Sequence, residues 1–207
     1  MICVLHSGGI DSTAVIQYYL NLNKIVQPLF IDYGQISAKT EFKYSQKIAN
    51  YFKINKPFFV NLRKFRDINP DHSLFSGKDR GNFHDSFKNQ FFPNRNLLLL
   101  TIGSVYCKSN NINKIAIGIV GGGSNSMGYP DTNSKFLKSV DSLFSSTLDI
   151  NVEGPIVSWT KKKVISFLNK NKFDFNLTFS CNVCSVHPCN KCASCIERNI
   201  ALNNYLL

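Results

Sequence analysis

The sequence predicts an α/β fold, a doubly wound parallel sheet followed by a small cysteine-rich C-terminal module. Short apolar segments rich in β-branched residues alternate with amphipathic helical patterns, which is typical of a parallel sheet covered by helices. The first apolar segment also breaks into a glycine turn at Ser7–Ser12 that opens a helical pattern. The module is predicted by the cysteines crowded between Cys181 and Cys195. We expect the sheet domain in residues 1–170 and the module in residues 171–207.

The predicted elements follow one another along the chain. Strands are expected at Ile2–Leu5, Ile25–Ile31, Phe58–Leu62 and Lys114–Ile119, and helices at Asp11–Leu22, Ser37–Phe52, Arg95–Cys107 and Ser134–Leu148. A further helix runs from Lys161 to about Asn169 and leads to the cysteines, and Cys195–Tyr205 is helical again. The exception is Arg63–Gln90, which is polar without clear periodicity and is expected to be a disordered insertion or a lid over the site.

The composition limits the class of protein. With 207 residues and 43% hydrophobic content, the chain buries a full core in one main domain. We expect a cytoplasmic protein with no membrane partner, because no segment is apolar enough for a membrane span and no signal region precedes the glycine turn. The net charge of +11 is spread along the chain, with Lys161-Lys162-Lys163 as a single run, so a nucleic-acid partner is not expected.

The glycine turn predicts a phosphate-binding site. Two adjacent glycines let successive backbone N–H groups point into one concavity, and the following helix adds the positive end of its dipole. The hydroxyls of the flanking serines add donors, and Asp11 is placed to hold Mg²⁺. The alternative is a plain turn in which Asp11 and Ser12 only cap the helix. The predicted phosphate-binding residues are Ser7, Gly8, Gly9, Asp11 and Ser12.

The cysteines predict a metal site. Two C-x2-C steps share Cys192, and tetrahedral Zn²⁺ needs four ligands of this kind. We expect the ligands to be Cys181, Cys189, Cys192 and Cys195, with Cys184 and His187 in reserve. An iron–sulfur cluster and simple buried cysteines are the alternatives. A closed four-ligand site has no open position for catalysis, so the metal is expected to be structural.

Six motifs in one order give the chain a resemblance over nearly its whole length. They are Ser7–Ser12, Asp32–Gln35, Phe92–Leu98, Gly128–Asp131, Pro155 to Lys161, and Thr178–Cys181 with the triplet Cys189, Cys192 and Cys195. Together they resemble the 7-cyano-7-deazaguanine synthase (QueC-like) family of PP-loop ATP pyrophosphatases. The resemblance implies the adenine nucleotide α-hydrolase-like fold.

The resemblance also implies a reaction and its participants. ATP with Mg²⁺ adenylates the carboxylate of 7-carboxy-7-deazaguanine, ammonia displaces AMP to give the amide, and a second ATP converts the amide to the nitrile. Asp11, Arg95 and Lys161 are the expected catalytic residues, although Arg95 could form an ordinary helix-start salt bridge and Lys161 could belong to a solvated run. The expected substrate-binding residues are Tyr33, Gln35, Tyr129 and Asp131. Asp131 could equally cap the helix that begins near Ser134.

Departures from the family pattern leave alternatives open. Ile36-Ser37 stands where Arg-His is usual, and the loop Asn125–Asn133 lacks an acid, a thiol and a guanidinium that its relatives carry. One alternative is therefore a divergent ligase of an antiphage system, which transfers the activated acyl group to an amine of a partner protein. Another is a non-catalytic, zinc-containing RNA-binding protein. A homodimer is also left open.

Overall fold

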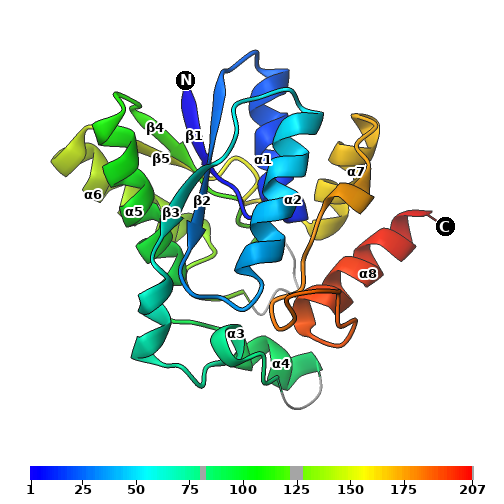
Figure 1. Cartoon of the computed structure of the whole chain (residues 1–207). Coiled ribbons are helices and arrows are strands. Elements are labelled where there is room, and N and C mark those ends of the chain that lie inside the picture. The colour runs from blue at the N-terminus through cyan, green and yellow to red at the C-terminus, as the bar shows by residue number, and fades with distance from the viewer. Residues whose placement is uncertain (80–82, 122–127, 207) are drawn as a thin grey trace.

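The computed structural model describes residues 1–79, 83–121 and 128–206 as one parallel sheet between two layers of helices (Figure 1). The strand order is β3-β2-β1-β4-β5, and every neighbouring pair is parallel. The strands are β1 (Ile2–Leu5), β2 (Val26–Asp32), β3 (Phe58–Asn61), β4 (Lys114–Ala116) and β5 (Asn151–Glu153). The predicted fold class is confirmed. The sequence pattern missed β5, because three residues with a single apolar side chain give no alternation signal.

The helices lie close to their predicted positions. They are α1 (Ile10–Asn21), α2 (Ala38–Tyr51), α3 (Ser73–Ser76), α4 (Phe83–Asn89), α5 (Arg95–Ser109), α6 (Ser134–Leu148), α7 (Lys161–Lys170) and α8 (Ala193–Leu206), with 3-10 turns at Arg63–Ile68 and Phe175–Leu177. Among the residues that the structure describes, no helix is long and apolar enough to cross a membrane.

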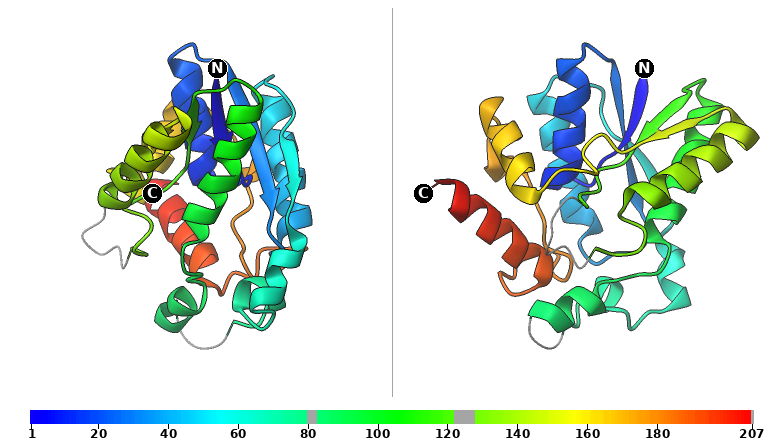
Figure 2. Two further views of the ribbon diagram at one scale, coloured as in Figure 1. Left: turned by 90° about the vertical axis from the view of Figure 1, so that its left-hand side faces the viewer. Right: turned by 180° about the vertical axis from the view of Figure 1, so that it is seen from behind.

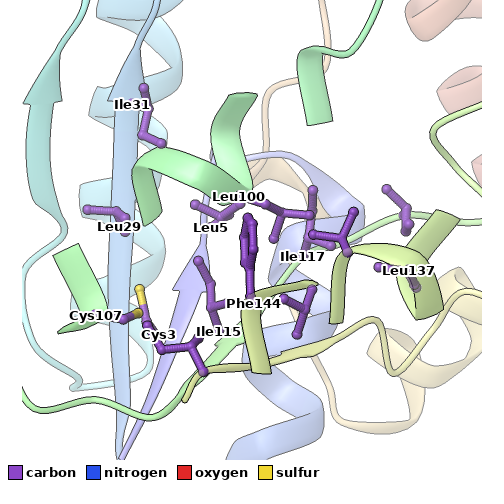
Figure 3. Packing of buried hydrophobic residues seen from close by; sticks show 14 of the residues in the cluster. Cys3, Leu5, Leu29, Ile31, Leu100, Cys107, Ile115, Ile117, Leu137 and Phe144 are labelled. Atoms are coloured by element: carbon purple, nitrogen blue, oxygen red, sulfur yellow. The ribbon is translucent and has the colours of Figure 1, made fainter. Parts of the chain in front are cut away.

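Alternation along the strands places the core on both faces of the sheet. In β1, Cys3 and Leu5 pack toward α5 and α6, whereas Ile2 and Val4 pack toward α1 and α7. Figure 2 shows α1 and α6 on opposite sides of the sheet, and Figure 3 shows the layer that joins β1, β2 and β4 to α5 and α6. Helices therefore cover both faces of the sheet at its central strands, and in a sheet of this kind ligands bind beyond the ends of the strands.

The segment Arg63–Gln90, expected to be a disordered insertion or a lid, is folded where it is described, with a 3-10 turn and the short helices α3 and α4 joined by turns. Residues 80–82 of this segment lie outside the described ranges. The backbone N–H of Ala193 donates to Ser86 Oγ at 2.9 Å, and Ser194 Oγ donates to Gln90 Oε1 at 3.2 Å. These bonds join α4 and its last turn to the start of α8 (Figure 1). The described part is thus a folded bridge to the cysteine-rich module.

The glycine turn is packed closely on three sides. Gly8 has a φ of +78°, and a Cβ there would lie 2.7 Å from the carbonyl oxygen of Glu41 in α2. A Cβ on Gly118, just beyond β4, would lie 2.7 Å from the backbone nitrogen of Ser12. The Gly8 carbonyl accepts the N–H of Phe179 at 2.9 Å, so the chain before the cysteines rests on the same turn.

We expect Gly8→Ala to lower the free energy of unfolding by about 1–3 kcal/mol, because the new methyl group combines a positive φ with a backbone clash. Gly9→Ala is the matched control: its φ is −87°, and its Cβ would lie 3.2 Å from the side-chain oxygen of Ser7 and 3.5 Å from the carbonyl oxygen of Phe179, with no backbone clash. Urea unfolding of both variants measures the difference. Equal stability of the two variants would contradict this account of the turn.

Candidate functional site

A cavity of about 270 Å³ opens at the carboxyl ends of β1, β2 and β4. Its walls come from the glycine turn, the first turns of α2 and α5, the start of α7, and the cysteine-rich module. Gly8 lies beneath the wall, held against α2, rather than in it. The remaining predicted phosphate-binding residues, Ser7, Gly9, Asp11 and Ser12, line the cavity. Other charged or polar side chains in its lining include Tyr33, Gln35, Glu41, Arg95, Lys161, Glu197 and Arg198.

The turn offers its backbone N–H groups to a ligand. Helix α1 has Gly9 at its N-cap, with no side-chain cap. The Gly9 carbonyl accepts the hydroxyls of Thr13 at 2.7 Å and Ser12 at 3.1 Å, which fixes the first turn of the helix. Asp11 and Ser12 therefore do not cap the helix, contrary to the plain-turn alternative. Uncapped N–H groups at the start of a helix, together with the helix dipole, are able to bind an anion.

Lys161 and Asp11 form an ion pair across this turn. The Lys161 Nζ lies 2.8 Å from Oδ1 and 2.6 Å from Oδ2 of Asp11, although 150 residues separate the two. Burial alone would lower the pKa of Lys161, but the Asp11 carboxylate outweighs burial and the pKa is raised. Lys161 is thus not part of a solvated run, whereas its neighbour Lys162 is exposed. It begins α7, where Thr160 accepts the N–H of Lys163 and caps the helix.

Arg95 begins α5 on the opposite wall. Asn94, with a φ of +56°, turns the chain into the helix. Burial by itself would lower the pKa of Arg95, but the hydroxyl of Tyr33 and the neighbouring Tyr129 and Asp131 outweigh burial and raise it. Arg95 therefore stays charged and lies beside Tyr33, as a positive group separate from Lys161.

Tyr129 and Asp131 lie behind Arg95, and the cavity lining found among the described residues does not include them. The Tyr129 hydroxyl donates to the carbonyl of Phe87 at 2.8 Å, and its ring stacks on Phe87 and Phe91. Asp131 accepts the backbone N–H of Asn96 at 3.1 Å. The alternative that Asp131 caps α6 is wrong, because Asn133 is the cap and accepts the N–H of Phe136.

Sequence reasoning missed three charged residues of the cavity, Glu41, Glu197 and Arg198. Glu41 lies in the first turns of α2, and Arg198 lies one helical turn after Cys195 in α8. Arg198 donates to Phe175 O at 2.8 Å and to the hydroxyls of Thr178 and Ser180, so it ties α8 to the chain that covers the turn. The sequence does contain a signal for Arg198: it follows Cys195 by three residues, and residues three apart lie on the same face of a helix. No local pattern marks Glu41.

The four predicted sulfur ligands lie together in the module. The Sγ atoms of Cys181, Cys189, Cys192 and Cys195 all lie within 4.8 Å of one another, and two of the pairs are 4.0 Å apart. Four thiolates around one tetrahedral ion at 2.3 Å would be separated by about 3.8 Å. Cys184 and the exposed His187 are not in this group. The donor set therefore fits a single metal ion.

Comparison with known proteins gives consistent matches. The family model described as "Queuosine biosynthesis protein QueC" matches residues 1–206. The chain is 32% identical to 7-cyano-7-deazaguanine synthase 1 of Desulfitobacterium hafniense, covering 97% of this chain and 90% of that protein. It is 30% identical to the 7-cyano-7-deazaguanine synthase of Buchnera aphidicola subsp. Schizaphis graminum, covering 99% and 90%.

A solved structure shares the fold. The U34-tRNA thiolase NcsA from Methanococcus maripaludis, solved with its 4Fe-4S cluster, superposes with a TM-score of 0.56 at 15% identity. The match covers 99% of this chain and 67% of that one. At this identity the likeness extends to the fold alone.

We expect Cys192→Ser to lose its bound metal and become insoluble or unfold at a lower temperature, because metal binding and folding of a small module are coupled. Cys184→Ser is the matched control, since Cys184 lies outside the group of four sulfurs. Elemental analysis of the purified proteins measures the metal content. A soluble and stable Cys192→Ser protein without metal would contradict a structural role for the site.

Proposed function

Because this chain belongs to the QueC family of queuosine biosynthesis proteins, an ATP-dependent enzyme family, we propose that it uses ATP to activate the carboxylate of 7-carboxy-7-deazaguanine. Ammonia then converts the adenylated carboxylate to the amide, and a second ATP drives formation of 7-cyano-7-deazaguanine. The observation that supports the proposal best is the meeting of an uncapped glycine turn, the Lys161–Asp11 pair and Arg95 in one cavity. The cytoplasm supplies both ATP and reduced thiols.

The proposed roles follow from charge and position. A carboxylate is a poor electrophile, and joining it to AMP creates a leaving group. The backbone N–H groups after Gly9 and the ammonium of Lys161 would hold the pyrophosphate that departs, since fixed positive groups stabilise charge that develops on it. Arg95 on the opposite wall is suited to the substrate carboxylate and the α-phosphate that it attacks. The apolar wall of Leu29, Ile31 and Leu99 suits the adenine ring.

Two metals fit the proposal. Carboxylate oxygen is the preferred ligand of Mg²⁺, so Asp11 would hold this ion. The bound Mg²⁺ would screen the charge of the phosphates. It would compete with the ammonium of Lys161 for the Asp11 carboxylate. In the module, the separations between the four thiols suit one Zn²⁺ better than an iron–sulfur cluster, which spreads its cysteines around several iron atoms.

One observation favours an alternative in which the activated acyl group has a different acceptor. Asn133, standing where the resemblance expects an arginine, is engaged as the cap of α6. The guanidinium that the resemblance expects in this loop is thus missing, and the altered residues 125–127 lie outside the described ranges. The alternative is that the activated acyl group passes to an amine of a partner protein instead of ammonia.

The test incubates the protein with ATP, Mg²⁺, ammonium and 7-carboxy-7-deazaguanine, and follows the products by mass spectrometry. The proposal expects AMP, pyrophosphate and the nitrile. AMP release that ends at the amide would overturn nitrile synthesis, and a mass gain on an added partner protein would overturn it in favour of the alternative. RNA binding without ATP consumption would overturn both in favour of a non-catalytic RNA-binding protein.

We expect Asp11→Ala to abolish pyrophosphate release, because Asp11 would hold the Mg²⁺, and Lys161→Gln to reduce kcat/KM for ATP by about 100-fold or more, because it removes a positive charge beside the phosphates. Lys162→Gln, on the exposed neighbour, is the matched control and should behave as the unaltered protein does. Circular dichroism checks that the fold is intact. Full turnover by Asp11→Ala would remove Asp11 from the mechanism.

A further inference from the structure

We infer that Glu41 determines substrate specificity: its carboxylate accepts two N–H bonds from the amidine edge of an aminopyrimidinone ring, the N1–H and 2-amino groups of the deazaguanine acceptor. Glu41 lines the cavity on the wall formed by α2. The inference rests on the proposed function for the identity of the ring. It adds the residue that distinguishes this ring from others.

The carboxylate of Glu41 is held in one orientation. Ser37 Oγ donates to its Oε1 at 2.8 Å, and Gln35 Nε2 donates to its Oε2 at 3.0 Å. Gln35 is itself fixed, because its Oε1 accepts the backbone N–H of Tyr33 at 2.9 Å. Both Glu41 oxygens are therefore placed by hydrogen bonds, one of them from a side chain that is itself held, which is the arrangement that a recognition group needs.

Glu41 has capacity left for a ligand. Each carboxylate oxygen can accept two hydrogen bonds, and one position on each is filled. The ion pairs found among the described residues do not include Glu41. Burial raises its pKa, which shows that the charged form is poorly solvated. Two adjacent N–H donors of a ligand would fill the remaining acceptor position on each of the two oxygens.

The chemistry of the cavity selects the amidine edge over other ligand groups. Unlike Asp11, which Lys161 neutralises, Glu41 is in none of the ion pairs found among the described residues, so its charge would repel a phosphate at the turn. The edge of adenine presents one donor and one acceptor, whereas a guanine-type edge presents two adjacent donors, which match the two oxygens. Arg95 lines the same cavity and suits a carboxylate on the other side of the ring. The two opposite charges thus match the two ends of one substrate.

The decisive test compares 7-carboxy-7-deazaguanine with its analogue that lacks the 2-amino group, 7-carboxy-7-deazahypoxanthine. We expect the unaltered enzyme to prefer the guanine form by about tenfold or more in kcat/KM for AMP release, as one lost member of a bidentate contact predicts. Glu41→Gln should lose activity on the guanine form while the preference falls to nearly one. The KM for ATP should not change.

Controls separate recognition from a structural role. Lys39→Gln, an exposed substitution on the same helix, should keep both activity and preference. If Glu41→Gln lowers activity on both substrates equally, or raises the KM for ATP or for ammonium instead, the inference is overturned. The unfolding temperature with and without ATP shows whether the variant is folded and still binds nucleotide.

A binding measurement keeps the inference separate from the proposed function. Isothermal titration of 7-deazaguanine and 7-deazahypoxanthine into the unaltered protein and into Glu41→Gln needs no turnover. If the unaltered protein releases no AMP but binds 7-deazaguanine more tightly through Glu41, the proposed reaction fails and the inference stands. If neither protein distinguishes the two bases, the inference fails whatever the reaction.

Discussion

The close packing around Gly8 is the constraint on which the rest of the site depends. A residue with a side chain does not fit, because α2 lies against the turn on one side, and the turn's carbonyl is bonded to Phe179 on the other. Gly118 is the second position without a side chain, at the point where the chain after β4 approaches α1. The absence of these side chains lets three separate segments meet at the first turn of α1, so that its N–H groups and dipole face one shared cavity.

The charged side chains that line this cavity neutralise one another only in part. Lys161 is matched by Asp11, whereas Arg95 and Glu41 lie on walls where hydroxyl and amide groups hold them. An unpaired charge in a partly buried site has an unfavourable desolvation free energy, and a ligand that carries the opposite charge offsets it. On the proposed function, this arrangement would give the cavity a phosphate end at the turn, an apolar wall for a base, and an end with opposite charges for the acceptor.

Local pattern predicted the parts of this structure that local chemistry determines. The strands β1 to β4, the glycine turn and the four-cysteine set follow from apolar alternation and ligand spacing, which neighbours in sequence decide. Strand β5 is too short to show a period, and the helices within Arg63–Gln90 are held by bonds to the module that no local pattern encodes. Glu41 was missed for the same reason, since only tertiary packing brings it opposite Arg95.

The module belongs to the candidate site as well as to the fold. Its metal set would be closed, with no position for a substrate, yet Cys195 lies one helical turn before Arg198, whose guanidinium holds the chain that covers the glycine turn. Ser194, between two of the sulfur ligands, lines the cavity and is bonded to Gln90. A metal that fixes the start of α8 therefore fixes one wall of the cavity. A purely structural ion would then act on nucleotide binding through position, without contacting the nucleotide.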